Sequence, residues 1–278
     1  MSPISEVPMD PIQDCSIFRL ESGRLAPATD KVITEVRIEL DINDGLHRVA
    51  ILCLPQDLEA LAVGFLLGEG LLRRREDLIG VESVPAEARV RVRGRFDAEA
   101  LEAMARRWTR ASGCGGGGTG RDLVAPDSLP LEAGPAVTPE RLLELTAAFH
   151  AQAALWQQTG GVHACALAAA DGILGFAEDI GRHNAFDKVI GKAFLDGIAV
   201  SDKFILTTGR ISAEIVSKAV ACRVPMLVSR SAVTSMAVRL ARRFNLTLVG
   251  FLRGRRLNVY TGYQRIVGST DAAADGST

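Results

Sequence analysis

The chain lacks paired cysteines, membrane-length apolar runs and a secretory leader. Its five cysteines are widely spaced, odd in number and never arranged as C-x-x-C, so we expect neither a disulfide framework nor a structural zinc site. No apolar run approaches the roughly 18 residues of a membrane-spanning helix. Residues 1–14 contain two aspartates and three prolines but no basic or apolar leader region. We therefore expect a cytoplasmic protein that does not associate with membranes.

The chain also has little net charge. Its 278 residues carry a formal net charge of −1 at pH 7, which gives no electrostatic reason to expect a nucleic-acid partner. Hydrophobic residues make up 47% of the sequence, enough for a sizeable core in one large or two small domains.

The first half of the chain predicts a small β-rich unit. Residues 1–31 are polar and contain several prolines, which is typical of a loose N-terminal arm. Alternating apolar residues and turn residues then predict strands and helices. The expected strands are 32–40, 46–54, 81–84 and 89–93, and the expected helices are 58–67 and 98–109.

A glycine-rich stretch at residues 112–120 contains Cys114 among six glycines. Glycine accepts positive φ without steric cost, so the stretch predicts a loop with accessible backbone amides. Four arginines lie beside it in the sequence, and nearby cations and amides lower a thiol pKa from its usual value of roughly 8.5. The stretch is therefore either a nucleophilic or sulfur-carrying cysteine loop or a low-complexity linker with an incidental cysteine.

The second half has a different rhythm, after a proline-containing linker at residues 123–137. Strands alternate with helices, which favours a mostly parallel sheet covered by helices. Ligands of such sheets bind beyond the carboxyl ends of the strands. The expected strands are 162–169, 173–177, 203–207, 225–229, 247–252 and 257–260, and the expected helices are 139–158, 184–195, 212–222 and 234–244.

Polar and cationic residues follow four of these strands. Serine, threonine and glycine at a strand-to-helix junction offer hydroxyls, free N–H groups and a helix dipole to a phosphate group. Arginines can neutralise a phosphate or stack on a purine. Ordinary helix capping explains any one junction, but four together favour an anionic, nucleotide-like ligand, although no Walker loop or G-x-G-x-x-G motif is present. The four segments are Glu178–Asn184, Thr207–Arg210, Ser229–Ser231 and Arg253–Arg256.

Two histidines differ in how well they fit a functional role. His183 is the better functional candidate because Asp179 and Asp187 flank it, although a structural network at the helix entry explains it equally well. We expect Asp179, Arg182 and His183 to shape a ligand pocket without binding metal. His163 fits a structural role.

Several long motifs resemble the formate dehydrogenase accessory sulfurtransferases, the FdhD family. The resemblance covers nearly the whole chain after the N-terminal arm. It implies an α/β fold, α+β overall, with a cytidine-deaminase-like mixed sheet covered by helices and a smaller N-terminal β-rich subdomain. The matching segments are Leu61–Gly70, Thr159–Ala164, Glu178–Gly191 and Thr208–Ser212.

This resemblance also implies a division of the chain and a function. We expect a flexible arm at 1–31, a smaller subdomain at 32–122 that ends in the Cys114 loop, a linker at 123–137, a cofactor-binding domain at 138–268 and a disordered tail at 269–278. Cys114 would carry sulfur as a persulfide from a cysteine desulfurase to the molybdenum bis(molybdopterin guanine dinucleotide) cofactor, bound as substrate. The cofactor would then serve the formate dehydrogenase catalytic subunit, and the carrier would be a homodimer.

The expected cofactor-binding residues come from the family match and from the strand ends. They are Phe251, Leu252, Arg253, Gly254, Arg255, Arg256, Thr208, Gly209, Arg210, Ser229 and His183. The position of the family's second loop cysteine is Gly117 here, so a relay between two cysteines is not available.

Two alternative functions differ in how well they agree with the sequence. A zinc nucleoside deaminase needs H-x-E or C-x-E and P-C-x-x-C, whereas this chain has His163-Ala164-Cys165 without a glutamate and no P-C-x-x-C. A non-enzymatic cofactor chaperone, in which Cys114 only docks or gates, stays open.

Overall fold

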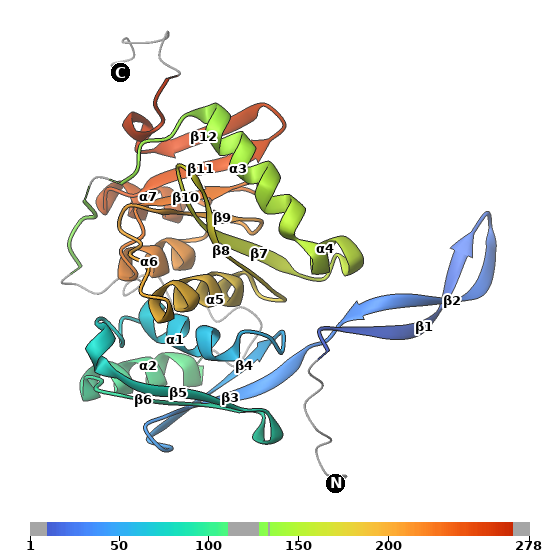
Figure 1. The fold of residues 1–278 in the computed structure, drawn as a ribbon, viewed down its shortest axis with the longest axis horizontal. Helices are drawn as coiled ribbons and strands as arrows, with labels where there is room; N and C mark the ends of the chain where they lie inside the picture. The colour runs from blue at the N-terminus through green and yellow to red at the C-terminus, as the bar shows by residue number, and fades with distance from the viewer. Residues whose placement is uncertain (1–9, 111–127, 133, 269–278) are drawn as a thin grey trace.

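A computed structural model describes residues 10–110, 128–132 and 134–268, with the side chains of residues 105–110 excepted (Figure 1). These residues form a two-stranded ribbon, a four-stranded sheet and a six-stranded sheet. The Cys114 loop, part of the expected linker and the tail at 269–278 lie outside the described residues.

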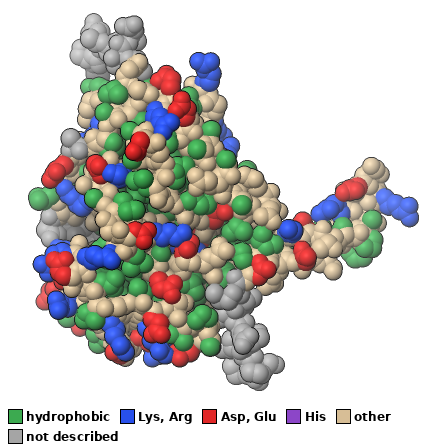
Figure 2. All heavy atoms as spheres, in the orientation of Figure 1, with side chains coloured by type: hydrophobic (Ala, Val, Ile, Leu, Met, Phe, Trp, Pro, Cys, Tyr) green, Lys and Arg blue, Asp and Glu red, His purple; other side chains and the backbone are tan. Residues whose placement is uncertain are grey.

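The N-terminal ribbon differs from the loose arm expected at residues 1–31. Strands β1 (Ile12–Glu21) and β2 (Arg24–Ile33) pair antiparallel and project from the body of the protein (Figure 1). Their connection is Ser22-Gly23, and both residues adopt positive φ, as a tight two-residue hairpin turn requires. Phe18, Leu20 and Leu25 are exposed on this ribbon, and hydrophobic side chains gather along one side of it (Figure 2).

The four-stranded sheet forms the smaller unit and has the order β4-β3-β6-β5. Every second residue of β3 from Val36 to Leu40 is buried, because successive side chains of a strand point to opposite faces. The buried face packs against helices α1 and α2. The strands are β3 (Val36–Ile42), β4 (His47–Cys53), β5 (Leu78–Val84) and β6 (Arg89–Gly94), and the helices are α1 (Leu58–Gly68) and α2 (Ala98–Arg110), with short 3-10 turns η1 (Arg75–Asp77) and η2 (Pro85–Glu87).

The six-stranded sheet has the order β12-β11-β10-β9-β7-β8. Only β9, β10 and β11 pair in parallel, so the alternation of strands and helices overstated the parallel share of this mixed sheet. The reason is that β7–β8 and β11–β12 are hairpins with two-residue turns, which need no helical crossover. The strands are β7 (His163–Ala169), β8 (Gly172–Asp179), β9 (Phe204–Thr207), β10 (Met226–Ser229), β11 (Thr247–Arg253) and β12 (Arg256–Thr261).

Helices cover both faces of this sheet, as expected (Figure 1). Helix α3 packs on one face through Leu142, Leu145 and Phe149, while α5, α6 and α7 pack on the other. The helix expected at 139–158 is interrupted at Ala153, because the Glu178 carboxylate accepts the N–H groups of Leu155 and Trp156 and starts a second helix there. The helices are α3 (Pro139–Gln152), α4 (Ala154–Thr159), α5 (Arg182–Leu195), α6 (Ala213–Ala221) and α7 (Ser235–Arg243), and a 3-10 turn η3 (Tyr263–Arg265) follows β12.

Helices α1 and α5 join the two units. A side chain on Gly64 would collide with the backbone carbonyl of Asp187, and one on Gly191 would collide with that of Ala60. The two helix backbones therefore touch directly at these glycines. One continuous hydrophobic core runs from the smaller sheet through this contact to the larger sheet.

Candidate functional site

Four strand ends of the larger sheet meet at one edge. Strand β8 points the same way as β9 because both pair antiparallel with β7, which lies between them. The residues after β8, β9, β10 and β11 therefore gather at this edge, together with His163 at the start of β7. We call this edge the strand-end site. It contains His163, Arg182, His183, Thr208, Gly209, Arg210, Ser212, Ser229, Arg230, Ser231, Phe251 and Arg253.

Three of the expected cofactor-binding residues hold the backbone of this site in place: Thr208, Gly209 and Ser229. Ser229 is buried, donates its hydroxyl hydrogen to the Gly209 carbonyl at 2.7 Å and accepts the Ser231 N–H at 2.9 Å. The Thr208 hydroxyl accepts the Ala164 N–H at 3.0 Å. A Cβ on Gly209 would lie 2.8 Å from the Arg182 Cβ, so a glycine is needed there. These side chains hold the loop in place, and direct contact with a ligand stays a prediction.

The predicted stretch 251–256 forms the hairpin between β11 and β12. Phe251 has a φ of 53°, a left-handed conformation held by its N–H bond to the Ser231 carbonyl at 3.1 Å. Arg253 donates from Nε to the Arg230 carbonyl at 2.8 Å, which ties this hairpin to the loop after β10. Leu252 is buried in the core, so its side chain is not available to a ligand.

The outer part of this hairpin is different. Arg253, Gly254, Arg255 and Arg256 are all exposed. None of the three guanidinium groups has a carboxylate partner among the described residues. Their positive charge is therefore available to an anion, and their role as ligands of the cofactor stays a prediction.

Unpartnered polar atoms also collect at the strand-end site. Arg182 Nε, His183 Nε2 and Ser212 Oγ are buried without a hydrogen-bond partner, and they are half of the six such side-chain atoms in the described ranges. Buried polar atoms in proteins are normally paired. A cluster of unpaired atoms at the ends of strands marks a place where a ligand can supply the missing partners.

Helix ends reinforce this pattern. Helices α5 and α6 begin here with Gly181 and Ser212 at their N-caps, and neither makes a side-chain capping bond. By contrast, Thr138 and Thr234 cap α3 and α7 through their hydroxyls. The free N–H groups and the positive dipole end of a helix attract anions. This difference is not visible in the amino-acid sequence, because a serine before a helix is the usual signature of a cap.

The charge of the site comes from arginines. Burial is the main cause that lowers the pKa of His183 to about 3, with smaller contributions from Lys218, Arg182 and His163, so this imidazole is neutral near pH 7. Burial also lowers the pKa of His163, helped by Arg182 and Arg210. The carboxylate nearest to His183 is Glu214, whose Oε2 lies 3.4 Å from Nε2. Two neutral imidazoles therefore lie among uncompensated guanidinium groups.

The carboxylates that flank His183 in sequence do not line the pocket, which corrects the expectation for Asp179. Asp179 is completely buried and accepts the N–H groups of Leu54 and Gly181, each at 3.0 Å. It also lies 2.6 Å from Lys188 Nζ. Asp187 is occupied in the interior by Lys218, whose Nζ donates to Oδ1 at 2.7 Å. Both aspartates are structural.

The described cysteines are poor nucleophiles or lie apart from the site. Cys53, Cys165 and Cys222 are buried, and burial raises the pKa of each thiol to about 12. Cys15 lies on the ribbon strand β1. Cys114 lies outside the described residues, so its role stays a prediction.

The described ranges contain neither a cluster of metal-ligating side chains nor a helix suited to span a membrane. No group of three or more histidine, cysteine, aspartate or glutamate side chains is arranged there to hold a metal ion. Likewise, none of the helices described is long and apolar enough to cross a membrane.

Comparisons with known proteins agree with this architecture. The model of the FdhD/NarQ family matches residues 33–267. A protein of Listeria innocua named sulfur carrier protein FdhD is 36% identical over 262 residues, which cover 93% of this chain and all of the relative. A protein of the same name from Wolinella succinogenes is 38% identical over 249 residues, covering 87% of this chain and 84% of the relative.

A solved structure is also similar. It is described as a formate dehydrogenase accessory protein from Desulfotalea psychrophila and superposes with a TM-score of 0.76 at 27% identity. The match covers 93% of this chain and all of the other.

Proposed function

This chain belongs to the FdhD/NarQ family, and we propose that it is a sulfur carrier that acts through a persulfide on Cys114. In this proposal a cysteine desulfurase supplies the sulfur. The carrier delivers it to the molybdenum bis(molybdopterin guanine dinucleotide) cofactor, which is bound as substrate and serves formate dehydrogenase.

The observation that carries the proposal is the unsatisfied, cationic character of the strand-end site. Arg182 and Ser212 have buried polar atoms without partners, and two uncapped helix N-termini point to the same edge. The diphosphate groups of a dinucleotide cofactor offer the anionic oxygens that these groups need. A hydrogen bond to a charged group contributes about 1.5–3 kcal/mol, so a few such contacts hold a polyanion firmly.

Different residues of the strand-end site have different roles in binding the cofactor. Ser229 and Thr208 fix the loops, Arg182 and Arg210 supply charge at the helix ends, and the exposed arginines of the β11–β12 hairpin extend the positive surface outward. One nucleotide end would lie against the helix ends, while the exposed hairpin would accept another part of the same cofactor.

Sulfur chemistry falls to Cys114. Its thiolate attacks the outer sulfur of the donor persulfide, the donor S–S bond breaks, and the donor cysteine leaves as a thiolate. The outer sulfur keeps its proton, so Cys114 becomes a persulfide without net oxidation or reduction. The buried thiols of Cys53, Cys165 and Cys222 stay protonated because of their raised pKa values, so they do not compete for this sulfur.

A second function is favoured by one feature of the sequence. The resemblance to the FdhD family implies a second loop cysteine at the position where this chain has Gly117. A chain with a single loop cysteine could instead act as a cofactor chaperone, in which Cys114 docks or gates without carrying sulfur.

Sulfur labelling distinguishes these functions. The protein is incubated with a cysteine desulfurase and cysteine, and the Cys114 peptide is examined by mass spectrometry. We expect one added sulfur on Cys114 and none on the other cysteines. Cys114→Ala should retain GDP binding but fail to activate formate dehydrogenase. Activation by Cys114→Ala would reject the carrier mechanism and favour the chaperone function.

A further inference from the structure

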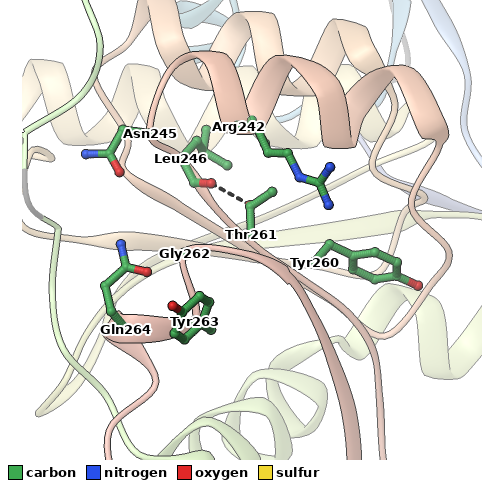
Figure 3. Close-up of a pocket in the computed structure, with 9 residues that line it drawn as sticks. Arg242, Asn245, Leu246, Tyr260, Thr261, Gly262, Tyr263 and Gln264 are labelled. Carbon is green, nitrogen blue, oxygen red and sulfur yellow. Dashed lines mark hydrogen bonds between the residues drawn. The ribbon is translucent and has the colours of Figure 1, made fainter. Parts of the chain in front are cut away.

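A groove lies between the end of α7 and the end of β12 (Figure 3). Because β12 runs antiparallel to β11, this groove is at the sheet edge opposite the strand-end site. It encloses about 320 Å³, within the range of ligand-binding pockets. Its walls include Arg242 and Asn245 from the α7 side and Tyr260, Tyr263 and Gln264 from the β12 side. We call it the α7–β12 groove.

The groove combines one cation with two aromatic rings. A hydrogen bond of 2.6 Å from the Thr261 hydroxyl to the Leu246 carbonyl closes its floor (Figure 3). The Arg242 guanidinium has no carboxylate partner in the described part of the chain, and Tyr263 is 77% exposed. This lining suits a ligand that presents a carboxylate next to an aromatic or aliphatic group.

Unpaired arginines distinguish this surface from the smaller sheet. On the smaller sheet, Arg89, Arg91 and Arg93 each contact a carboxylate at 2.7–3.1 Å. On α7, Arg239 and Arg242 are exposed and make no such contact with any residue described.

The sequence explains this difference. Residues 204–268 contain eleven lysines and arginines and a single carboxylate, Glu214. Cations in the last turn of a helix offset its dipole, which accounts for Arg242 in part. This effect does not account for Arg239, which lies a turn earlier, or for the exposed Tyr263. Excess positive charge that the chain itself does not neutralise favours an acidic partner.

The groove lies beside the point where the chain returns from its cysteine-bearing stretch. Leu131 donates its N–H to the Phe244 carbonyl at 2.9 Å, and its own carbonyl accepts from Asn245 Nδ2 at 2.9 Å. Asn245 lines the groove. Cys114 precedes Ser128, where the described chain resumes, by fourteen residues. A protein held in the groove is thus adjacent to one attachment point of the segment that contains Cys114.

We propose that the α7–β12 groove docks an acidic segment, with an aromatic or aliphatic anchor, of the protein that donates sulfur to Cys114. The identity of this partner rests on the proposed function. Because the groove and the strand-end site lie at opposite edges of the sheet, the donor and the cofactor occupy different surfaces. A carrier can then be loaded without releasing the cofactor.

Charge reversal tests the docking directly. The double variant Arg239→Glu with Arg242→Glu should bind the cysteine desulfurase at least about tenfold more weakly than the unaltered protein. The matched control is Arg91→Glu with Arg93→Glu, which makes the same charge change on the smaller sheet and should bind normally. Tyr263→Ala, which changes no charge, should also weaken binding. Equal affinity of the α7 variant and the control would overturn the proposal.

Two sulfur donors separate this inference from the proposed function. Glutathione persulfide, a small donor that needs no docking surface, should load Cys114 equally in the α7 variant and in the unaltered protein. Loading by the desulfurase should fall only in the α7 variant. Failure of both donors to load the unaltered protein would refute the carrier function, while the affinity measurement would still decide the groove. If GDP displaces the desulfurase and Arg242→Glu abolishes this displacement, the groove is a nucleotide site and the proposal is overturned.

Discussion

Lys188 Nζ lies 2.6 Å from Asp179 Oδ2, and both side chains are completely buried. The same carboxylate accepts the Leu54 N–H from the smaller unit and the Gly181 N–H at the start of α5. This ion pair therefore connects the smaller unit, the end of β8 and the entrance of α5, directly beneath the strand-end site.

Removing the lysine should be costly. Lys188→Met leaves the Asp179 charge buried without its cation, and such changes destabilise proteins by about 3–5 kcal/mol. Urea unfolding followed by circular dichroism measures the effect. Lys192→Met is the matched control on the same helix, since its ion pair with Asp57 is partly exposed and should be worth at most about 1 kcal/mol. Equal losses in the two variants would show that the buried pair has no special role.

His183 should make stability depend on pH. Its pKa is lowered from 6.5 to about 3 in the folded protein, mainly by burial, so the unfolded chain binds a proton more readily between these values. The contribution of the neutral His183 imidazole to the free energy of unfolding is fully present above pH 6.5 and is lost as the pH falls toward 3. His183→Gln should therefore lose less stability than the unaltered protein between pH 7.5 and pH 5.

The two pH values separate packing from titration. The difference between the proteins at pH 7.5 gives the cost of changing the side chain itself, and any further difference at pH 5 reports the imidazole. Parallel loss of stability in both proteins would show that His183 is not the titrating group.

Arg182 and Ser212 should contribute to anion binding. Their buried polar atoms lack partners in the structure, so a bound phosphate would complete them. We expect Arg182→Ala to weaken GDP binding by about tenfold or more and Ser212→Ala by several-fold, since charged hydrogen bonds contribute more than neutral ones. Isothermal titration calorimetry measures both. Arg37→Ala, on the smaller sheet, is the control, and GDP binding equal to that control would remove both residues from the site.

The hairpin arginines should act through charge. Arg255 and Arg256 are exposed beside the strand-end site and have no carboxylate partner among the residues described. Replacing both by alanine should weaken GDP binding and reduce its sensitivity to salt, because screened interactions are then fewer. Replacing both by lysine keeps the charge but not the guanidinium geometry, so this variant should bind GDP more tightly than the alanine variant. A titration that is unchanged in the alanine variant would place the nucleotide elsewhere.

Local sequence patterns predicted most of the elements correctly. The alternation in β3 and the turn residues between the expected strands 32–40 and 46–54 predicted the first hairpin of the smaller sheet. The polar residues after β9 and β10 predicted where the strand ends gather. These signals are local, because side-chain period and turn chemistry depend on near neighbours in the chain.

Features that depend on distant partners were not predictable. The Asp179 carboxylate accepts the Leu54 N–H, which lies 125 positions away in the sequence. It is therefore not available to a ligand, although it is close to His183 in the sequence. Ser212 has the sequence signature of a cap but makes no capping bond. The α7–β12 groove forms only when two separate segments meet. Tertiary contacts decide each of these cases, and a single sequence does not reveal them.

The direct contact of α1 with α5 has a mechanical consequence. Because Gly64 and Gly191 bring the two backbones together without intervening side chains, the helices have no room to slide past one another. Helix α2 belongs to the smaller unit and ends at Arg110, whereas Leu131 is bonded to the end of α7 on the larger unit. The cysteine-bearing segment thus leaves the smaller unit and rejoins the larger one, so the packing of α1 against α5 sets the distance between its two points of attachment.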